Sequence, residues 1–301
     1  MPLAFFHAAH TAFNHSKMVT PKKNFPPARA CLFDMDGLLL DSEDKYTICT
    51  NTVLNKYGKP NIPWSIKAKM QGRPAPAASD VLHKWASLPI SRSQYTAEVQ
   101  ALQKEHFPSC SPLPGVPELL KNLSTATVSP PSPFPPDKTE KKNERVQLAL
   151  ATSSHAWTFA LKTAHLEESL LHVFPPSRRV LGDDRRIGPG RGKPSPDIYI
   201  LALADVNATL NEHEEKIRPE ECLVFEDSVP GVEAGRRAGM RVVWCPHPEL
   251  LGEFKGREDL VLAGRIGEAG CVDMHLVGDE WAEYLETLEA FPYERYGFVV
   301  R

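Results

Sequence analysis

The chain has 301 residues, of which 42% are hydrophobic and 24% charged, and its formal net charge is −3. A chain of this size can bury a full core, either as one domain with a large insertion or as two domains. Because the net charge is slightly negative and no dense block of Lys and Arg occurs, neither a nucleic-acid surface nor an anionic-membrane surface is expected. No apolar run approaches the roughly 20 residues that cross a bilayer.

The cysteines and the N-terminal residues bear on the location of the protein. Six cysteines are scattered without a C-x-x-C pair, which favours a reducing compartment, so we predict a cytoplasmic protein and expect a monomer. Residues 1–27 contain no acidic side chain and are predicted to be a disordered tail. A mitochondrial transit segment is the weaker alternative, since the tail lacks the Arg richness of such segments.

A strand and a group of helices are the first predicted elements. Residues 28–33 form an apolar run that ends at the acidic turn 34–37 (DMDG), which predicts a strand with chemistry at its end. From residue 43 to about residue 123 apolar residues recur at helical spacing. Three helical faces consist of Tyr46, Cys49, Val53 and Tyr57, of Ala78, Val81, Leu82 and Trp85, and of Tyr95, Val99 and Leu102. We predict a small helical domain over residues 43–114, its third helix capped near Ser93.

The composition changes again at residues 124–145, which are rich in Ser, Thr, Lys and Pro. Five prolines lie between residues 130 and 136, and proline is not tolerated inside a helix or a central strand. We predict a flexible insertion.

Strands and helices alternate after this insertion. Strand candidates lie at 146–151, 179–181, 221–225 and 241–244, and helix candidates at 197–204 and 232–238. The alternation is typical of an α/β fold with a doubly wound parallel sheet, whose ligand crevice lies at the carboxyl ends of the strands. We assign residues 28–42 and 115–301 to this core domain.

Polar side chains stand at the predicted strand ends or in the adjoining loops; they are Asp34, Asp36, Thr152, Ser153, Lys193, Glu226 and Asp227. Several carboxylates share a small site only when a cation neutralises them, and an all-oxygen ligand set suits Mg²⁺. A hydroxyl and a lysine beside such a metal supply the donors and the positive charge that phosphoryl transfer requires. The sequence therefore predicts a Mg²⁺-dependent phosphoryl-transfer site, with a small phosphorylated metabolite as its partner.

Taken one at a time, these residues have plainer interpretations. Asp34 and Asp36 could form an ordinary Asp-Gly turn, and Thr152 could simply cap the next helix. Lys193 could be a solvated loop lysine, and Glu226 could be a surface acid at a strand end.

Four stretches resemble the motifs of the haloacid dehalogenase superfamily, in the same order along the chain. They are FDMDGLLLDS at 33–42, LALATSS at 148–154, GKPSPD at 192–197 and FEDS at 225–228. The resemblance implies a Rossmann-like core with a helical cap that closes over the active site and excludes bulk water. The cap position corresponds to residues 43–114, with hinges expected near residues 41–44 and 112–115.

The same resemblance implies a role for each residue. Asp34 is the nucleophile that forms an aspartyl-phosphate, and Asp36 is the general acid and base, which requires a carboxyl that changes protonation near neutral pH. Thr152 and the backbone amide of Ser153 bind the phosphate, and Lys193 compensates its charge.

The metal ligands are also implied by the resemblance. The Asp34 carboxylate, the Asp36 backbone carbonyl and Asp227 hold Mg²⁺, and Glu226 assists directly or through a water.

Asp36 and Tyr46 narrow the choice among branches of the superfamily. Dehalogenases and phosphonatases usually lack the second Asp, so Asp36 disfavours them. β-Phosphoglucomutases keep both aspartates but typically have His where this chain has Tyr46, so we favour a phosphatase over the mutase. A catalytically silent binding protein is a third possibility, but such a protein would be expected to have lost a motif residue.

The loop KMQGRP at 69–74 is expected to reach the leaving group, with Gly72 and Arg73 as substrate-binding residues. Trp64 could stack on a base or sugar, whereas Trp85 is expected to pack in the helical core. From about residue 28 to residue 248 the pattern is similar to pseudouridine-5'-phosphatase-like enzymes, which implies a nucleotide-like or sugar phosphate as substrate. Those enzymes have a Gly-Lys-Lys sequence at the loop, so the departure at Arg73 leaves the substrate open.

Overall fold

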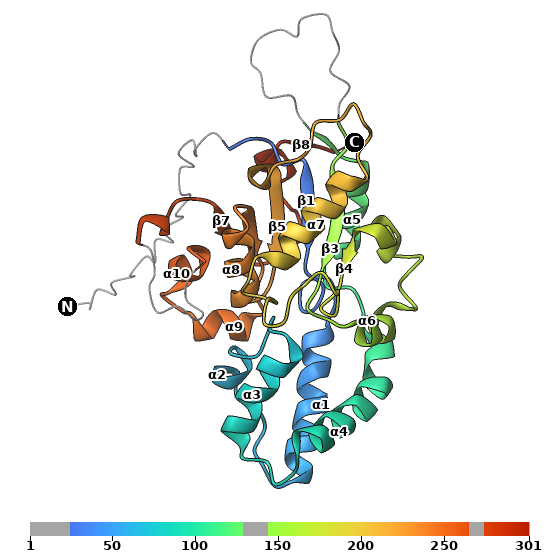
Figure 1. Cartoon of the computed structure of the whole chain (residues 1–301). Coiled ribbons are helices and arrows are strands. Elements are labelled where there is room, and N and C mark those ends of the chain that lie inside the picture. Colours follow the sequence, from blue (N-terminus) through green and yellow to red (C-terminus); the bar gives the residue numbers. More distant parts are fainter. Residues whose placement is uncertain (1–24, 129–143, 265–273, 301) are drawn as a thin grey trace, which may run out of the picture.

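The computed structural model describes residues 25–128, 144–264 and 274–300 (Figure 1). The predictions for the N-terminal tail and for the proline-rich part of the insertion fall mainly outside these ranges. Within them, no helix is long and apolar enough to cross a membrane. Five cysteines lie in the described ranges, and all five are free thiols.

A six-stranded sheet with the order β4-β3-β1-β5-β6-β7 forms the centre of the molecule. All neighbouring strands are parallel, which confirms the predicted α/β fold. The strands are β1 (Ala30–Phe33), β3 (Gln147–Ala151), β4 (Arg179–Val180), β5 (Cys222–Glu226), β6 (Arg241–Trp244) and β7 (Ala282–Tyr284). Every residue of β1, β5 and β6 is buried because helices cover both faces of the sheet.

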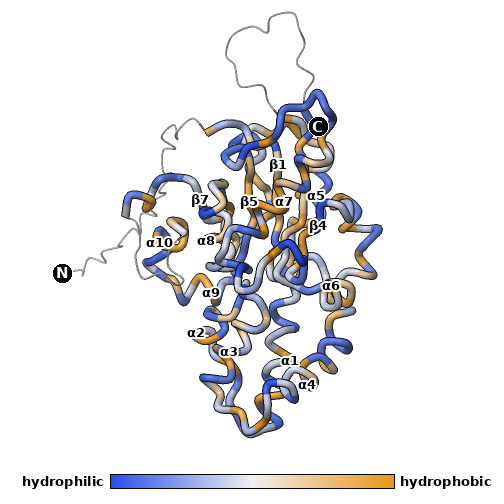
Figure 2. Tube along the Cα trace, in the orientation of Figure 1, coloured by the Kyte–Doolittle hydropathy of each residue, from blue (hydrophilic) through white to orange (hydrophobic). Residues whose placement is uncertain are grey.

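Successive strand residues point to opposite faces, so each face has its own core. Figure 2 shows that hydrophobic residues are frequent along the central strands. On one face, Leu32 and Val224 pack with residues of three helices. These helices are α7 (Asp197–Ala208), α8 (Val229–Arg237) and α10 (Glu258–Leu262).

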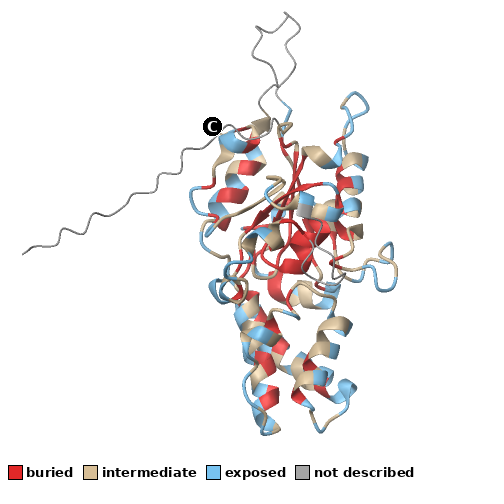
Figure 3. Ribbon diagram, turned by 90° about the vertical axis from the view of Figure 1, so that its left-hand side faces the viewer, coloured by how far each residue is buried: buried red, intermediate tan, exposed pale blue. Residues whose placement is uncertain are grey.

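The other face is covered by α5 (Val116–Thr125) and by the C-terminal segment. Phe33 and Phe225, on adjacent strands, stack with their ring centroids 4.4 Å apart, and Phe291 packs on Phe225 at 5.3 Å. This aromatic cluster packs at the ends of β1 and β5, where Phe33 and Phe225 come immediately before acidic residues of the motifs. Figure 3 shows the buried residues concentrated along the strands in the middle of the molecule.

Four helices lie beyond the carboxyl ends of the strands, at the bottom of Figure 1. They are α1 (Ser42–Lys56), α2 (Trp64–Lys67), α3 (Ala75–Ala86) and α4 (Arg92–His106), and we call them the helical unit. Val53, Leu82 and Tyr95, one from each predicted helical face, form its own small core. The predicted cap near Ser93 is wrong by two residues: Ser91 has an extended backbone and its hydroxyl accepts a hydrogen bond from the amide of Gln94.

The two connections of the helical unit lie side by side. Leu40 and Pro112 form an antiparallel bridge. The amide of Asp41 donates to the carbonyl of Ser111 at 3.0 Å, and the Asp41 carboxylate accepts from the Ser111 amide at 2.8 Å. The chain therefore enters and leaves the helical unit through one paired segment, in the region where we expected the hinges.

The described ends of the predicted insertion are ordered. Residues 124 and 125 complete the last turn of α5, and β2 (Thr127–Val128) pairs with β8 (Phe298–Val299). Arg145 forms a bridge with Thr127 on the return. We predicted flexible structure for all of residues 124–145, and this was wrong for the flanking residues. They are ordered because the C-terminal strand β8 pairs with β2.

Candidate active site

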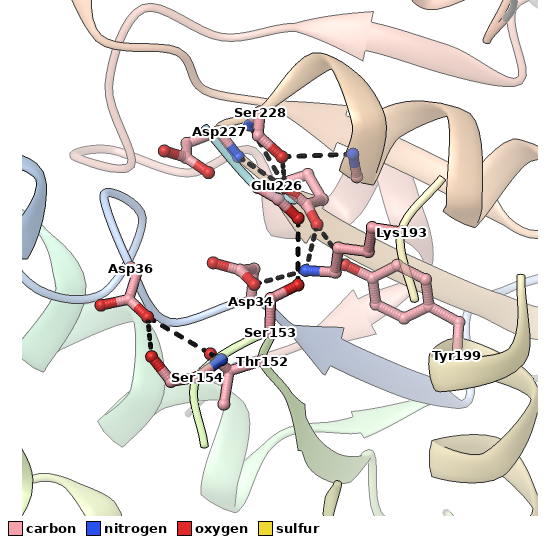
Figure 4. A network of polar contacts seen from close by, with 12 residues as sticks. Asp34, Asp36, Thr152, Ser153, Ser154, Lys193, Tyr199, Glu226, Asp227 and Ser228 are labelled. Atoms are coloured by element: carbon pink, nitrogen blue, oxygen red, sulfur yellow. Dashed lines mark hydrogen bonds and ion pairs between the residues drawn. The ribbon is translucent and has the colours of Figure 1, made fainter. Parts of the chain in front are cut away.

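The carboxyl ends of β1, β3 and β5 carry the predicted site residues (Figure 4). Asp34 follows β1, Thr152 follows β3 and Asp227 follows β5. Lys193 comes from the loop before α7, and its ammonium contacts Asp34 and lies 2.6 Å from Glu226 Oε1. The parallel topology thus joins residues from four distant parts of the sequence.

Three buried carboxylates form the acidic part of the site. Asp34, Glu226 and Asp227 each offer one oxygen, and these oxygens lie within 4.8 Å of one another. Lys193 offsets one of the three negative charges, so a formal charge of −2 is left in a buried site. Such a charge is costly in a low-dielectric environment, and a divalent cation that prefers oxygen ligands would neutralise it. The donor set therefore fits Mg²⁺.

The pKa values of two of these carboxyl groups are raised. Burial raises the pKa of Asp34 to about 7; the ammonium of Lys193 opposes this shift, and repulsion from Glu226 adds to it. The pKa of Asp227 is raised well above its ordinary value by burial and by repulsion from Asp34 and Glu226. Both shifts indicate that the site favours added positive charge.

Glu226 is held from several sides. Its Oε1 accepts a hydrogen bond from the hydroxyl of Tyr199 at 2.5 Å, beside the contact with Lys193. Its Oε2 accepts from the hydroxyl of Ser228 at 3.0 Å. A Cβ at Gly231 would lie 1.8 Å from Glu226 Oε1, so only glycine lets the first turn of α8 approach this carboxylate.

Asp36 belongs to a separate polar cluster. Its carboxylate accepts hydrogen bonds from the hydroxyls of Ser42 and Ser154, both at 2.6 Å, and contacts the buried ammonium of Lys162. Burial alone would raise the pKa of Asp36, but Lys162 and the two hydroxyls outweigh it, so the pKa is lowered. The structure thus favours the carboxylate, the form of a base, whereas the resemblance implied a carboxyl that changes protonation near neutral pH.

The two predicted phosphate-binding residues differ in their surroundings. The Thr152 hydroxyl is fully buried, accepts from the amide of Ser154 at 3.1 Å and lies 3.4 Å from Asp36 Oδ2. Ser153 lines the cavity described below, and its hydroxyl donates to the carbonyl of Gly72 at 3.0 Å. Phosphate binding by these residues stays a prediction.

The predicted substrate loop packs at the carboxyl end of the sheet, against the residues that follow β5. Gly72 has a φ of 74°, and a Cβ there would lie 2.1 Å from Ser228 Oγ. A Cβ at Gly192 would lie 2.3 Å from Cγ of Pro74, in the same loop. Glycine on each side of the contact therefore lets the helical unit approach the core closely.

Gln71 connects this loop to the acidic cluster. Its Nε2 donates to Asp227 Oδ2 at 2.5 Å, and the side chain is only 4% exposed. Its Oε1 is buried and has no hydrogen-bond partner among the described residues. A buried amide oxygen left without a donor is unfavourable, so this oxygen is a ready acceptor for a group that enters the site.

A cavity of about 390 Å³ begins at Asp34 and Asp36 and extends between α1, α3 and α4. Arg73 lines it, as expected of a residue near the leaving group. Its wall is otherwise mainly apolar or uncharged and includes Thr47, Thr50, Ile62, Met70, Leu82, Tyr95, Val99, Gln100 and Gln103.

Trp64 and Trp85 do not line this cavity, whereas Trp157 does. Trp64 stacks on His247 with ring centroids 4.7 Å apart, and the ammonium of Lys67 lies 4.4 Å from the Trp64 ring centroid. The expectation that Trp64 could stack on a substrate is wrong, because its faces are used between α2 and the core. Trp85 packs against the core of the helical unit, as expected.

Sequence reasoning missed four residues of the site. Ser42 and Ser154 stand inside two of the motif stretches, so the next polar position in each motif was an available signal. Gln71 stands in the predicted substrate loop, directly before Gly72. Lys162, on α6 (Ala156–Thr163), had no such signal, since nothing near it in the sequence pairs it with Asp36.

Comparison with known proteins places these features in a family. The family model for haloacid dehalogenase-like hydrolases matches residues 28–239. A Saccharomyces cerevisiae protein named probable pseudouridine-5'-phosphatase is 37% identical over 269 residues, which cover 89% of this chain and 97% of that protein. (DL)-glycerol-3-phosphatase 1, mitochondrial, of Arabidopsis thaliana is 32% identical over 239 residues, which cover 78% and 70%.

Solved structures agree on the fold. CbbY from Rhodobacter sphaeroides, in complex with phosphate, matches with a TM-score of 0.54 and 18% identity, covering 88% of this chain and 96% of that one. At this identity the likeness concerns the fold alone.

Proposed function

Since the chain belongs to the haloacid dehalogenase-like hydrolases, we propose that it is a Mg²⁺-dependent phosphatase that acts on a small phosphomonoester. One observation carries the proposal: three buried carboxylates share one lysine, and one of the three, Asp34, lines a cavity whose wall is mostly uncharged. An oxygen-rich site of this charge attracts a divalent cation and, with it, a phosphoryl group.

The proposed first step is an attack by Asp34 on phosphorus. A carboxylate oxygen of Asp34 forms the new P–O bond, and the bond between phosphorus and the leaving oxygen breaks with its electron pair on that oxygen. Lys193 contacts Asp34 directly, so it orients the nucleophile and offsets the charge of the incoming phosphate. Asp36 supplies the proton to the leaving oxygen. Its contacts with Lys162 and the two hydroxyls favour the carboxylate, whereas the negative charge of a bound phosphate favours the protonated form that this step requires.

The proposed second step releases phosphate. A water attacks phosphorus, Asp36 takes a proton from it, and the P–O bond to Asp34 breaks. The carboxylate form that the structure favours for Asp36 is the form required here.

Mg²⁺ would be held by Asp34, Asp227 and Glu226, and when bound it would neutralise the phosphoryl oxygens and polarise the phosphorus. The carbonyl of Asp36 is the further ligand that the family resemblance implies. Gln71 donates to Asp227 and so helps to orient one ligand carboxylate from outside the core.

The cavity composition favours an uncharged leaving group that forms hydrogen bonds. Lys67 lines the cavity but is paired with Glu43 at 3.2 Å, so its charge is already compensated. Gln103 is only 7% exposed and faces a cavity whose inner wall includes the Tyr95 ring and Leu82. A side-chain amide beside an aromatic and aliphatic wall suits a nucleoside. We therefore propose a nucleotide-like substrate, such as pseudouridine 5'-phosphate, with sugar phosphates as the next class to test.

The test is phosphate release from a panel of monoesters that includes pseudouridine 5'-phosphate, glycerol 3-phosphate and glucose 6-phosphate, with and without Mg²⁺. We expect turnover only with the metal, and its loss in Asp34→Asn. Asp44→Asn, the same change at an exposed position of α1, is the matched control and should leave turnover unchanged. Full activity of Asp34→Asn would refute the nucleophile.

The alternative activity, that of a β-phosphoglucomutase, is tested with the same protein and variants. β-Glucose 1-phosphate is incubated with its bisphosphate activator, and the product is analysed. Glucose 6-phosphate without free phosphate would contradict the proposed hydrolysis.

A further inference from the structure

Lys162 is a fully buried lysine that the proposed steps do not use. Its ammonium contacts Asp36, donates to the hydroxyl of Ser154 at 2.5 Å and lies 3.2 Å from the hydroxyl of Tyr46. The rings of Tyr46 and Phe107 surround it, with centroids 5.1 and 5.4 Å from Nζ. The lysine is thus packed by aromatic rings and has oxygen partners only where it meets the Asp36 cluster.

The contacts of Asp36 are divided between its two oxygens. Oδ1 accepts from Ser42 at 2.6 Å and meets Lys162, while Oδ2 accepts from Ser154 at 2.6 Å and has Thr152 at 3.4 Å (Figure 4). Lys162 also bonds Ser154, so it fixes the carboxylate directly and through one of its other donors. Removing Lys162 would leave Oδ1 with Ser42 as its donor and would take from Ser154, the donor to Oδ2, the ammonium that holds it.

Stability alone is a weak reason for this lysine. A buried ion pair often stabilises a protein no more than well-packed apolar side chains of the same size, so an apolar residue would serve a purely structural role at least as well. Lys162 also forms a neutral pair with Asp36, apart from the acidic cluster that Lys193 contacts. A lysine retained at this position therefore points to a task at Asp36.

The position of Lys162 shows what kind of task this is. Asp36, Tyr46 and Ser154 line the cavity, whereas Lys162 has no exposed surface and lies behind them. It therefore touches Asp36 rather than a substrate in the cavity. Tyr46 belongs to α1 of the helical unit and Lys162 to α6 of the core, so their contact also ties the two parts together beside Asp36.

We propose that Lys162 is a positioning residue: it holds the Asp36 carboxylate in the orientation from which Asp36 exchanges protons with the leaving group and with water, and Tyr46 steadies Lys162. This inference rests on the proposed phosphatase function. In the step concerned, the bond from phosphorus to the leaving oxygen breaks, its electron pair goes to that oxygen, and the proton comes from Asp36. A misplaced Asp36 therefore slows the hydrolysis of an ester most when its leaving group must be protonated as it departs.

The experiment compares two leaving groups in the full-length protein. An alkoxide must be protonated as it leaves, whereas p-nitrophenolate leaves without a proton because its charge is delocalised. We compare kcat/KM, because this ratio reports the transfer of the phosphoryl group to Asp34 and not the later hydrolysis of the aspartyl-phosphate, which is the same for both esters. We expect Lys162→Met to lower kcat/KM for an alkyl phosphate by about tenfold or more, and kcat/KM for p-nitrophenyl phosphate by less than about threefold. Tyr46→Phe, which removes only the hydroxyl, should also slow the alkyl phosphate more than p-nitrophenyl phosphate, but the difference between the two esters should be smaller than in Lys162→Met.

Two further variants keep the test decisive if Lys162→Met folds poorly. Asp36→Asn removes the carboxylate that Lys162 positions, and adding Lys162→Met removes the other charge of the pair, so the double variant should show no additional loss of kcat beyond that of Asp36→Asn. Thr163→Val is the matched control, because Thr163 is the next residue of α6, is buried, and donates only to the carbonyl of Phe159. Thr163→Val should leave the turnover of both esters unchanged.

The outcomes separate the inference from the function on which it rests. If the wild-type protein hydrolyses both esters but Lys162→Met slows them equally, the positioning role is wrong and the phosphatase stands. An additional loss in the Asp36→Asn background leads to the same conclusion, since Lys162 would then act elsewhere. If the wild-type protein hydrolyses neither of these esters nor any monoester of the panel above, the phosphatase proposal fails, and the inference with it.

Discussion

Gly72→Ala tests whether the substrate loop must lie against the core during turnover. A Cβ at residue 72 would lie 2.1 Å from Ser228 Oγ and 2.6 Å from Ser228 Cβ, distances that real side chains essentially never show. To reach even 3.0 Å, the loop has to withdraw by about 0.9 Å from Ser228. Ser228 has little room to give way, since it caps α8 and bonds Glu226.

Two effects of this substitution must be separated. The left-handed backbone of residue 72 opposes any side chain by about 1–2 kcal/mol, regardless of its neighbours. Gly58→Ala isolates that effect, because Gly58 also has a positive φ, 67°, but a Cβ added there would meet no neighbouring atom within 4 Å. Both variants should unfold at lower denaturant concentration, Gly72→Ala by more than Gly58→Ala because it adds the contact with Ser228 to the backbone strain.

Activity should distinguish the two variants. A displacement near 1 Å in an element that positions a substrate can reduce the rate about 10²-fold. We therefore expect kcat/KM for phosphate release to fall about 10²-fold in Gly72→Ala and to stay within about twofold of wild type in Gly58→Ala. Equal activity of the two variants would refute the idea that the enzyme works with this loop seated on Ser228.

Three other substitutions test separate parts of the structure. Ser91→Ala removes the hydroxyl that accepts from the Gln94 amide and should lower the free energy of unfolding by about 1 kcal/mol in a denaturant titration without changing turnover; unchanged stability would contradict the cap. Tyr199→Phe removes the bond to Glu226 and should raise the Mg²⁺ concentration for half-maximal activity about 10- to 100-fold, and an unchanged requirement would exclude a supporting role. Gln103→Leu should raise KM about tenfold for nucleotides but not for p-nitrophenyl phosphate; an equal rise would argue against recognition of the base.

The central strands could be predicted from the sequence because burial on both faces requires nearly every residue in them to be apolar. The runs at 222–226 and 241–244 are buried throughout, so a continuous apolar pattern was sufficient. The strand at 282–284 was missed because it lies at the sheet edge, is only partly buried and has no apolar run. A helix after Thr152 was considered, but its range, 156–163, was not predicted, since His155 precedes it without a side-chain cap.

The candidate site was predictable where its residues follow strand ends. Asp34, Thr152 and Asp227 are placed by the strands immediately before them, so local sequence was enough to bring them together. Lys162 pairs with Asp36 across 126 positions, and that contact depends on how α6 packs rather than on any local pattern. The pairing of the Ser91 hydroxyl, rather than that of Ser93, likewise depends on the exact backbone conformation.

The paired connection at Leu40 and Pro112 bears on how proteins of this architecture evolve. Because the two ends of the helical unit are neighbours, inserting it lengthens one loop of the core without separating the elements on either side, and the chain entropy lost in closing that loop grows only slowly with its length. Another segment with equally close ends could take its place while β1 and α5 kept their positions. The part that shapes the leaving-group pocket can therefore be replaced as a module, while the nucleophile of the core stays where it is.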